Sequence, residues 1–284
     1  MEKLIIYAAI GYPGGANPKY PAIPSTWEKM LDEAAAVREA GASIIHFHGP
    51  HDSERRIVPD EWGKLAENIR KVSGLLIDFG QAGAPLDQRI PLMKLGTGRP
   101  DFMGISLTNH DYRRYNEKRG HHDVYYTHPR SELEEYCALV REYKIKPNWE
   151  VWHLGGMWNF NYLAEKGLVD KPYWFNLLFG TPGGVWSPSS VAEINHRLDH
   201  MPEGSHSLLA PRGPAGPINQ TRMLTLGMIR GGHVRCGAQD IPEYTDGVPA
   251  KSNSEIVARI ARIAKELGRE IATPDDTRRI LGMN

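Results

Sequence analysis

The stretch "GASIIHFHGPHD", residues 41–52, decides how this sequence folds. Gly41, the first residue of this stretch, marks the point where a helix ends and a strand begins. In the apolar run that follows, His46 and His48 alternate with Ile45 and Phe47. The period of two in a β-strand therefore places the histidines on one face and the apolar pair on the other. With the apolar face packed against helices, the histidines point inward.

Seven other short apolar or β-branched runs accompany this one, and most are followed by a segment with helical spacing. The eight runs begin at Leu4, Ala42, Gly74, Phe102, Lys146, Tyr173, Ser205 and His233. The helical segments cover residues 25–41, 59–74, 130–144, 161–167, 189–200, 219–232 and 252–268. This alternation predicts an α/β fold, a (β/α)8 TIM barrel, as a single domain over residues 1–284. Residues 273–283 are expected to form one more short helix behind a threonine cap.

The overall composition excludes several classes of partner. The chain has 34 basic and 34 acidic residues, so it lacks the charge excess typical of proteins that bind nucleic acid or anionic membranes. No apolar segment approaches the length of a membrane span. The two cysteines, Cys137 and Cys236, have no CxxC partner and fit a reducing compartment. We expect a soluble, cytoplasmic protein that binds neither nucleic acid nor membrane.

One connection is long for a compact domain. Residues 109–130 follow the fourth strand and are rich in charged residues, histidine and tyrosine. Loops of this length are usually lids, binding loops or oligomer arms. The alternative is a solvent-exposed loop without a specific function. We predict a lid or an oligomer arm.

The two inward histidines are candidate metal ligands. Neutral imidazoles two residues apart on a strand can reach one divalent ion, and nitrogen ligands favour zinc or a related transition metal. The alternative is that the two histidines are polar residues of a water-filled barrel mouth without a metal. A catalytic zinc site also needs a third protein ligand. The same alternation aims Asp78 of the third strand inward, together with Ser106 and Thr108 of the fourth.

A second polar group lies on the last strand, "GGHVRCGAQD", residues 231–240. Its inward face is predicted to hold His233, Arg235, Gly237 and Gln239. The guanidinium of Arg235 suits a carboxylate, and Asp240 could pair with it or act as a base. A purely structural ion pair is the alternative. Glu150, inside the barrel on the fifth strand, needs a partner such as a metal, Arg235 or a substrate group.

The blocks "REAGASIIHFHG", "KPNWEVWHLGGM", "GGHVRCGAQD" and "AKSNSEIVARIARIAKELGREIATPDDTRRILGM" resemble the β-keto acid cleavage enzyme family, which includes 3-keto-5-aminohexanoate cleavage enzyme. The resemblance implies a zinc-containing TIM barrel, usually a homotetramer, that converts a β-keto acid and acetyl-CoA into acetoacetate and a new acyl-CoA. It implies that His46 and His48 hold the metal. It also implies that Arg235 and Asp240 form a dyad whose aspartate abstracts a proton for retro-Claisen cleavage.

The chain departs from the family pattern around the metal. Family members usually place a glutamate directly before the dyad aspartate as the third ligand, and Gln239 stands there in this chain. A neutral ligand would bind zinc more weakly. Glu150, or His153 where an aspartate is usual, could complete the shell. The family's arginine shortly after the histidine pair is also missing, since the chain continues with "GPHD".

These changes bear on the substrate. The aromatic residues Tyr12, Trp149, Trp152 and Trp158, which we expect around the mouth of the barrel, suggest a larger or more aromatic substrate than a short amino keto acid. The residues expected to contact it are Tyr12, Asp78, Ser106, Thr108, Glu150 and Trp152. Two alternative functions stay open: a CoA-independent hydrolase or lyase of a related β-dicarbonyl compound, and a catalytically silent binding member of the family.

Overall fold

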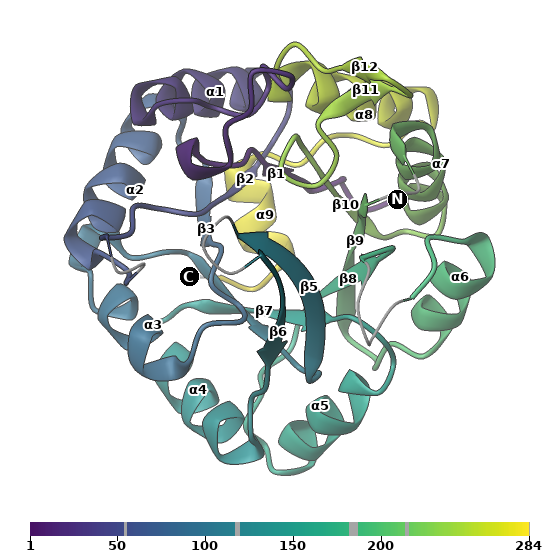
Figure 1. The fold of residues 1–284 in the computed structure, drawn as a ribbon. Coiled ribbons are helices and arrows are strands. Elements are labelled where there is room, and N and C mark those ends of the chain that lie inside the picture. Colours follow the sequence, from purple (N-terminus) through teal and green to yellow (C-terminus); the bar gives the residue numbers. More distant parts are fainter. Residues whose placement is uncertain (54–55, 117–119, 182–186, 214–215, 284) are drawn as a thin grey trace.

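The computed structural model contains a closed barrel of eight parallel strands, which confirms the TIM-barrel fold (Figure 1). The strands follow the order of the chain around the barrel, and the first and last pair with each other. The barrel strands are β1 (Ile6–Ala9), β2 (Ile44–Phe47), β3 (Leu76–Phe79), β4 (Phe102–Ser106), β7 (Lys146–Val151), β8 (Tyr173–Phe179), β9 (Ser205–Pro211) and β10 (His233–Cys236). The structure describes residues 1–53, 56–116, 120–181, 187–213 and 216–283.

One helix follows each barrel strand and packs on the outside. In the described part of the chain these helices are α1 (Trp27–Glu39), α2 (Pro59–Ser73), α3 (Leu86–Met93), α4 (Arg130–Glu142), α5 (Gly156–Glu165), α6 (Val191–Asp199), α7 (Gly216–Ile229) and α8 (Asn253–Glu266). Short elements complete the loops: η1 (Pro13–Gly15), η2 (Gly96–Gly98), β11 (Glu243–Thr245) and β12 (Val248–Pro249). The helix α3, which is short and contains Pro91, was not expected from the sequence, and α5 begins at Gly156 and not at residue 161 as predicted. Among the described residues, every helix is too short or too polar to span a bilayer.

The apolar faces of the strands form the main core against the helices. Ile45 and Phe47 of β2 are completely buried there, as the alternation in residues 41–52 predicted. The ring of Phe79 lies 5.5 Å from that of Phe47 and 4.9 Å from that of Trp62 on α2. Each such side chain contributes about 1.5–3 kcal/mol through burial, so this layer fixes which face of each strand points inward.

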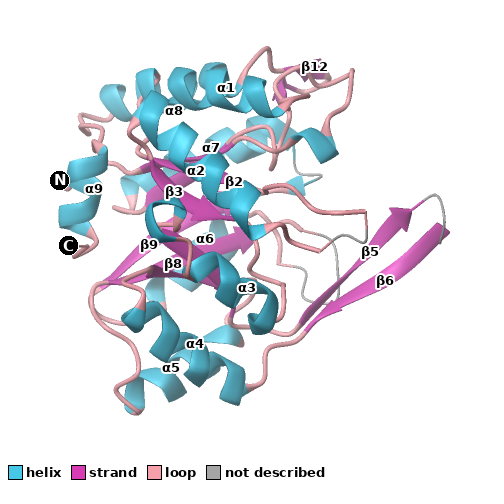
Figure 2. Ribbon diagram, turned by 90° about the vertical axis from the view of Figure 1, so that its left-hand side faces the viewer, coloured by secondary structure: helices cyan, strands magenta, loops and turns pink. Residues whose placement is uncertain are grey.

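A further helix, α9 (Pro274–Ile280), covers the amino ends of the strands. Thr273 caps it in a reciprocal capping box with Asp276, as predicted for this segment. The completely buried Leu281, which follows α9, packs in the lower barrel interior with Phe102 and Trp174. In Figure 2, α9 and both termini lie at the end of the barrel opposite the projecting hairpin. This helix therefore forms the floor of the barrel.

The long connection after β4 is an antiparallel hairpin of β5 (His110–Asn116) and β6 (Gly120–Tyr126), which the sequence analysis did not recognise as strands. It lies in front of the barrel in Figure 1 and projects beyond the body of the molecule in Figure 2. Its base is anchored, because the ring of His110 stacks on Tyr126 at 5.0 Å and on Trp152 at 4.3 Å. Residues 117–119 of the predicted lid or arm lie outside the described residues.

Candidate active site

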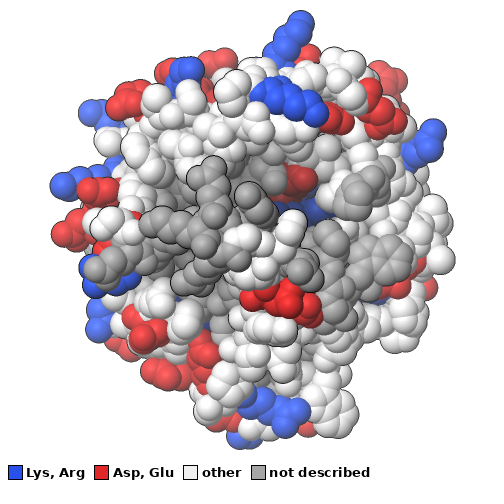
Figure 3. All heavy atoms as spheres, in the orientation of Figure 1, with Lys and Arg blue, Asp and Glu red and all other residues white. Residues whose placement is uncertain are grey.

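A cavity of about 630 Å³ opens at the carboxyl ends of the barrel strands. Figure 3 shows this face of the molecule, hollowed near its centre, with acidic and basic atoms visible inside. Eight of the predicted site residues line the cavity: Tyr12, His46, His48, Asp78, Glu150, Trp152, Arg235 and Gln239. The inward alternation of β2, β3, β7 and β10 thus brings together residues that are far apart in the sequence.

Two histidines and one glutamine converge inside the cavity. The Nε2 atoms of His46 and His48 lie 3.1 Å and 3.2 Å from Nε2 of Gln239. The turn after β10 makes this approach possible. A Cβ atom on Gly237, whose φ is +138°, would lie 2.2 Å from the carbonyl oxygen of Ala9, so only glycine fits there.

The other side of the His46 ring is held by a carboxylate. Its Nδ1 atom lies 2.6 Å from Oδ2 of Asp78, which also accepts a 2.5 Å hydrogen bond from the hydroxyl of Tyr7. An Nδ1–H that donates to Asp78 leaves the Nε2 lone pair facing the cavity. Burial, reinforced by Arg235, holds the pKa of His46 well below its usual value, and burial likewise lowers the pKa of His48. Both rings are therefore neutral at pH 7, as metal ligands must be.

The donor set fits a zinc ion. Ligand atoms about 2.0–2.2 Å from a tetrahedral zinc lie roughly 3.3 Å from one another, close to the separations observed here. The buried Oε1 of Gln239 has no hydrogen-bond partner among the described residues. Since amide oxygen and nitrogen are interchanged by rotating the group, Oε1 can take the place between the histidines. His46, His48 and Gln239 would then supply two nitrogens and one oxygen.

Next to this group, Asp240 is clamped by two arginines. Nε and Nη2 of Arg235 donate to its two carboxylate oxygens at 2.7 Å and 2.9 Å, and Nε of Arg212 lies 2.9 Å from Oδ1. Burial alone would raise the pKa of Asp240, but the two guanidiniums outweigh it and hold the pKa below its usual value. Asp240 is therefore ionised at neutral pH, the state that a base requires.

Glu150 and His153, the two possible additional ligands, are placed differently. Glu150 lines the cavity, and burial raises its pKa to about 7, although Arg235 and Arg212 act in the opposite direction. His153 is turned toward its own loop, where Nδ1 accepts the backbone N–H of Gly155 at 3.0 Å. It is not among the described residues that line the cavity. Of the two, only Glu150 shares the cavity with the histidines.

Several predicted substrate contacts lie elsewhere. Ser106 and Thr108 are buried beneath the cavity and outside its described lining; the Ser106 hydroxyl donates to the carbonyl oxygen of Thr108 at 2.9 Å. Trp149 packs among the outer helices with Tyr136 at 5.6 Å, and Trp158 is 71% exposed on α5. The expectation that four aromatic residues surround the mouth was therefore wrong for these two tryptophans.

Several residues at the site were not predicted from the sequence. Arg212 directly follows β9 and is a quarter exposed at the mouth, so the cavity contains an arginine besides Arg235, although the family's arginine after the histidine pair is absent from "GPHD". Its position right after a strand end was a usable signal. Tyr7 could have been found by extending the alternation to β1. His110 and Tyr126, which line the cavity from the hairpin, carried no comparable pattern.

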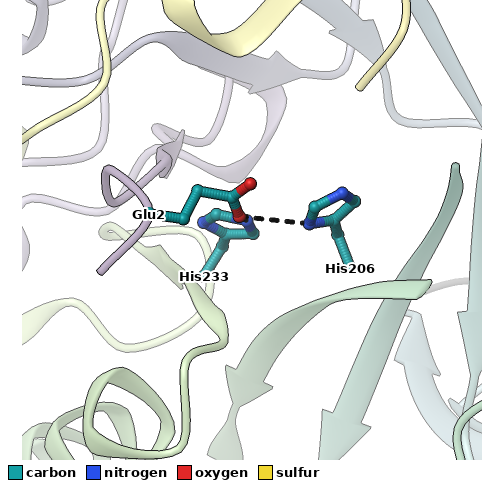
Figure 4. Close-up of side chains that lie close together, drawn as sticks. All are labelled: Glu2, His206 and His233. Carbon is teal, nitrogen blue, oxygen red and sulfur yellow. Dashed lines mark ion pairs between the residues drawn. The ribbon is translucent and has the colours of Figure 1, made fainter. Parts of the chain in front are cut away.

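A second histidine cluster lies at the opposite end of the barrel (Figure 4). Oε1 of Glu2 lies 3.3 Å from Nδ1 of His206 and 3.4 Å from Nε2 of His233. However, Nδ1 of His233 accepts the backbone N–H of Ile5 at 3.0 Å, so the ring proton sits on Nε2. A metal-bound histidine normally donates from its second nitrogen, as His46 can to Asp78. The tautomer of His233 therefore disfavours a metal and favours a hydrogen bond to Glu2.

In (β/α)8 barrels, enzymes bind and convert their substrates at the carboxyl ends of the strands. The fold and the position of the cavity thus define the class of this protein as a TIM-barrel enzyme. Comparison with known sequences narrows the class, because residues 3–283 match the family described as beta-keto acid cleavage enzyme. The chain belongs to this family and is a divergent member of it.

The relatives support this membership. The chain is 32% identical over 285 residues to a 3-keto-5-aminohexanoate cleavage enzyme of Fusobacterium nucleatum, covering 100% of this chain and 99% of the relative. It is 25% identical over 270 residues to a 3-oxoadipate:acetyl-CoA acetyltransferase of Cupriavidus necator, covering 93% and 89%. Among solved structures, apo ObcA superposes with a TM-score of 0.69 at 18% identity, covering 93% of this chain and 66% of ObcA. That likeness concerns the fold alone.

Proposed function

We propose that this enzyme cleaves a β-keto acid by a retro-Claisen route, with acetyl-CoA as the acyl acceptor and with zinc or another divalent transition metal as cofactor. Its products would be acetoacetate and a new acyl-CoA. The observation that carries the proposal is the convergence of His46, His48 and Gln239 in one cavity, together with Arg212 and Arg235. These two arginines clamp Asp240, which is not itself among the described residues of the cavity lining. The names of the relatives, which include an acetyl-CoA acetyltransferase acting on 3-oxoadipate, support the reaction class.

The metal site would act on the oxygens of the keto acid. His46, His48 and Gln239 would hold the ion, with Asp78 fixing the ring of His46. When bound, the ion would polarise the keto and carboxylate oxygens as a Lewis acid. Glu150, which shares the cavity, is a further candidate for contact with the ion or the substrate.

Asp240 is the proposed base. It is ionised and fully buried, and Arg235 holds it in a fixed orientation through two hydrogen bonds. A carboxylate with a lowered pKa is a weak base, so proton abstraction requires a substrate made more acidic by its surroundings. Arg212, with part of its side chain exposed, can bind a substrate carboxylate and so weaken its own contact with Asp240. That exchange would raise the proton affinity of Asp240 when substrate is present.

The shape of the cavity limits the substrate. Tyr12 and Trp152 line it, and Tyr126 adds an aromatic wall from the hairpin. We propose that the base of the hairpin contacts the substrate, whereas the role of its outer part as a lid or oligomer arm stays a prediction. Ser106 and Thr108 would act by supporting His110, whose Nδ1 lies 3.2 Å from the Ser106 hydroxyl. The homotetramer and the cytoplasmic location also stay predictions, and light scattering tests the former.

Labelled acetyl-CoA tests the reaction. The zinc-loaded enzyme is incubated with acetyl-CoA carrying ¹³C in its acetyl group and with a panel of aliphatic, aryl and cyclic β-keto acids. We expect label in the keto end of acetoacetate and an unlabelled new acyl-CoA. Cleavage at the same rate without acetyl-CoA would instead identify a hydrolase or lyase of the same bond. No turnover of any β-keto acid by zinc-loaded protein would refute the proposal.

The base is tested by Asp240→Asn, with Asp32→Asn on the exposed face of α1 as a matched control. Asp240→Asn should abolish turnover and retain zinc, while the control should change neither. Breaking the buried ion pair is expected to cost about 3–5 kcal/mol of stability, so circular dichroism must show that the variant is folded at the assay temperature. Near-native turnover by folded Asp240→Asn would show that another group is the base.

A further inference from the structure

A second cavity lies at the opposite end of the barrel from the active site. It has a volume of about 660 Å³ and is lined by the amino ends of β4, β7 and β8, by the segment around η2, and by α9 with the residues that follow it. Among the described residues, its lining contains seven basic and two acidic side chains, in a chain whose formal net charge is zero. Positive charge is therefore concentrated in this basal cavity.

The two carboxylates of the basal cavity are already occupied by arginines. Asp101 accepts hydrogen bonds from Nη2 of Arg70 and Nη2 of Arg278, each at 2.9 Å. Asp170 accepts two from Arg141, at 2.7 Å and 2.9 Å. They are thus unavailable to neutralise the remaining cations of the lining.

Four basic residues remain: Arg99, Lys144, Lys146 and Lys171. Within the described ranges, none of them has a carboxylate at ion-pair distance. Lys146 gives the strongest evidence for an anion site. It is mostly buried, and its ammonium donates a hydrogen bond to a neutral acceptor, the carbonyl oxygen of Pro172, at 2.6 Å. Burial lowers its pKa to about 8, with Asp170 acting in the opposite direction. A mostly buried cation with no carboxylate at ion-pair distance is costly, and an anion in the cavity would reduce that cost.

The kind of cation indicates the kind of anion. Lysine ammonium groups bind phosphate oxygens as compact point charges, and the planar fork of an arginine matches phosphate as well as carboxylate. The cavity is within the size range of small-molecule sites, which is about 300–1,000 Å³. Trp149 and Trp174, both almost completely buried, pack behind the charged residues in its lining. We propose that the basal cavity is a binding site for a small phosphate-bearing anion, separate from the active site.

Calorimetry of the zinc-loaded protein tests this proposal with pyrophosphate as the probe and citrate as a carboxylate of similar charge. We expect saturable binding of pyrophosphate and weaker binding of citrate. Lys146→Gln should raise the Kd for pyrophosphate by about tenfold or more, because it removes a charge-assisted hydrogen bond. Lys251→Gln, an exposed change outside this cavity, is the matched control and should leave the Kd unchanged.

A second variant separates binding from folding. Lys144 has a positive φ of 52°, a conformation that glycine adopts without strain, so Lys144→Gly removes a charge while it relaxes the backbone. Its thermal midpoint should be unchanged or higher, and its Kd for pyrophosphate should rise. Absence of saturable pyrophosphate binding to the wild type, equal or tighter binding of citrate, or an unchanged Kd in both cavity variants would overturn the proposal. Turnover and zinc content of these variants do not enter the test.

Discussion

The Nδ1 atom of His46 lies 2.6 Å from Oδ2 of Asp78, and this contact decides which nitrogen of the ring faces the active-site cavity. The hydrogen bond from Tyr7 to the same carboxylate helps to keep Asp78 in place. In His233 the arrangement is reversed, because Nδ1 accepts a backbone N–H. Two buried histidines in one barrel therefore have different capacities for metal binding, set by the partner of the second nitrogen.

Asp78→Asn should weaken zinc binding by a factor on the order of 10 to 100, the usual effect of losing a carboxylate that orients a ligand histidine. The change keeps the size of the side chain, so the barrel should remain folded. Affinity is measured by competition with a chromophoric chelator. Asn148→Asp, which adds a carboxylate near Asp78 without removing it, is a useful comparison, since Nδ2 of Asn148 lies 3.4 Å from Oδ1 of Asp78. Unchanged zinc affinity in Asp78→Asn would show that His46 needs no such partner.

Gln239→Glu should tighten zinc binding by about tenfold or more. A tenfold lower Kd requires only about 1.4 kcal/mol of binding free energy, which the attraction between the added negative charge and the zinc ion supplies. Nε2 of Gln239 already lies 3.1 Å and 3.2 Å from the Nε2 atoms of His46 and His48. A glutamate carboxylate at this position therefore reaches the metal without a change in the backbone. The matched control is Gln81→Glu, which places a carboxylate in the lining of the same cavity, beside His51. Equal tightening in both variants would mean that charge in the cavity, not ligation by residue 239, is responsible.

The sequence predicted the barrel because its strands repeat one simple rule. An apolar residue must face the helices, so the intervening His46, Asp78, Glu150 and Arg235 must face inward. What the rule could not supply is the distance between side chains on different strands, which depends on how the strands are staggered when the barrel closes. The contact of Asp78 with His46 is of this kind.

Other features escaped prediction for different physical reasons. Arg212 follows the last residue of β9, and alternation has no meaning beyond the end of a strand. The sequence of residues 110–126 is rich in charged residues, histidine and tyrosine and shows no apolar period that would reveal strands. Trp149 was assigned to the mouth from its aromatic character, although its place in the alternation pointed it toward the helices, where the structure has it.

Leu281→Ala should destabilise the protein by about 2–5 kcal/mol, the usual cost of a large-to-small change in a close-packed interior. Leu281 is completely buried against the lower barrel interior, so truncation leaves a void under the floor formed by α9. Urea unfolding followed by circular dichroism measures the loss. Ile229→Ala on the exposed end of α7, where the side chain is 58% exposed, should cost far less. Similar stability of the two variants would show that α9 is not needed to close the barrel.

Gly80→Ala should remove zinc with little loss of stability. A Cβ atom on Gly80 would lie 2.5 Å from Nε2 of His48, a distance at which the imidazole must move. The backbone of Gly80 is not in the left-handed region, so alanine itself is not strained there. We therefore expect a fall in zinc affinity of more than about tenfold, comparable with the loss of a ligand-orienting contact. The thermal midpoint of the metal-free protein should stay close to that of the wild type.

The matched control for this change is Gly15→Ala, which adds a methyl group near the same cavity. Its Cβ atom would lie 3.7 Å from the ring of Tyr12, an ordinary contact that displaces nothing. Zinc affinity in this variant should equal that of the wild type. Gly80 and His48 lie on neighbouring strand ends, so this pair of alanine variants tests the position of one imidazole without altering any donor atom. If Gly80→Ala bound zinc as tightly as Gly15→Ala, His48 could not be a ligand in the position described.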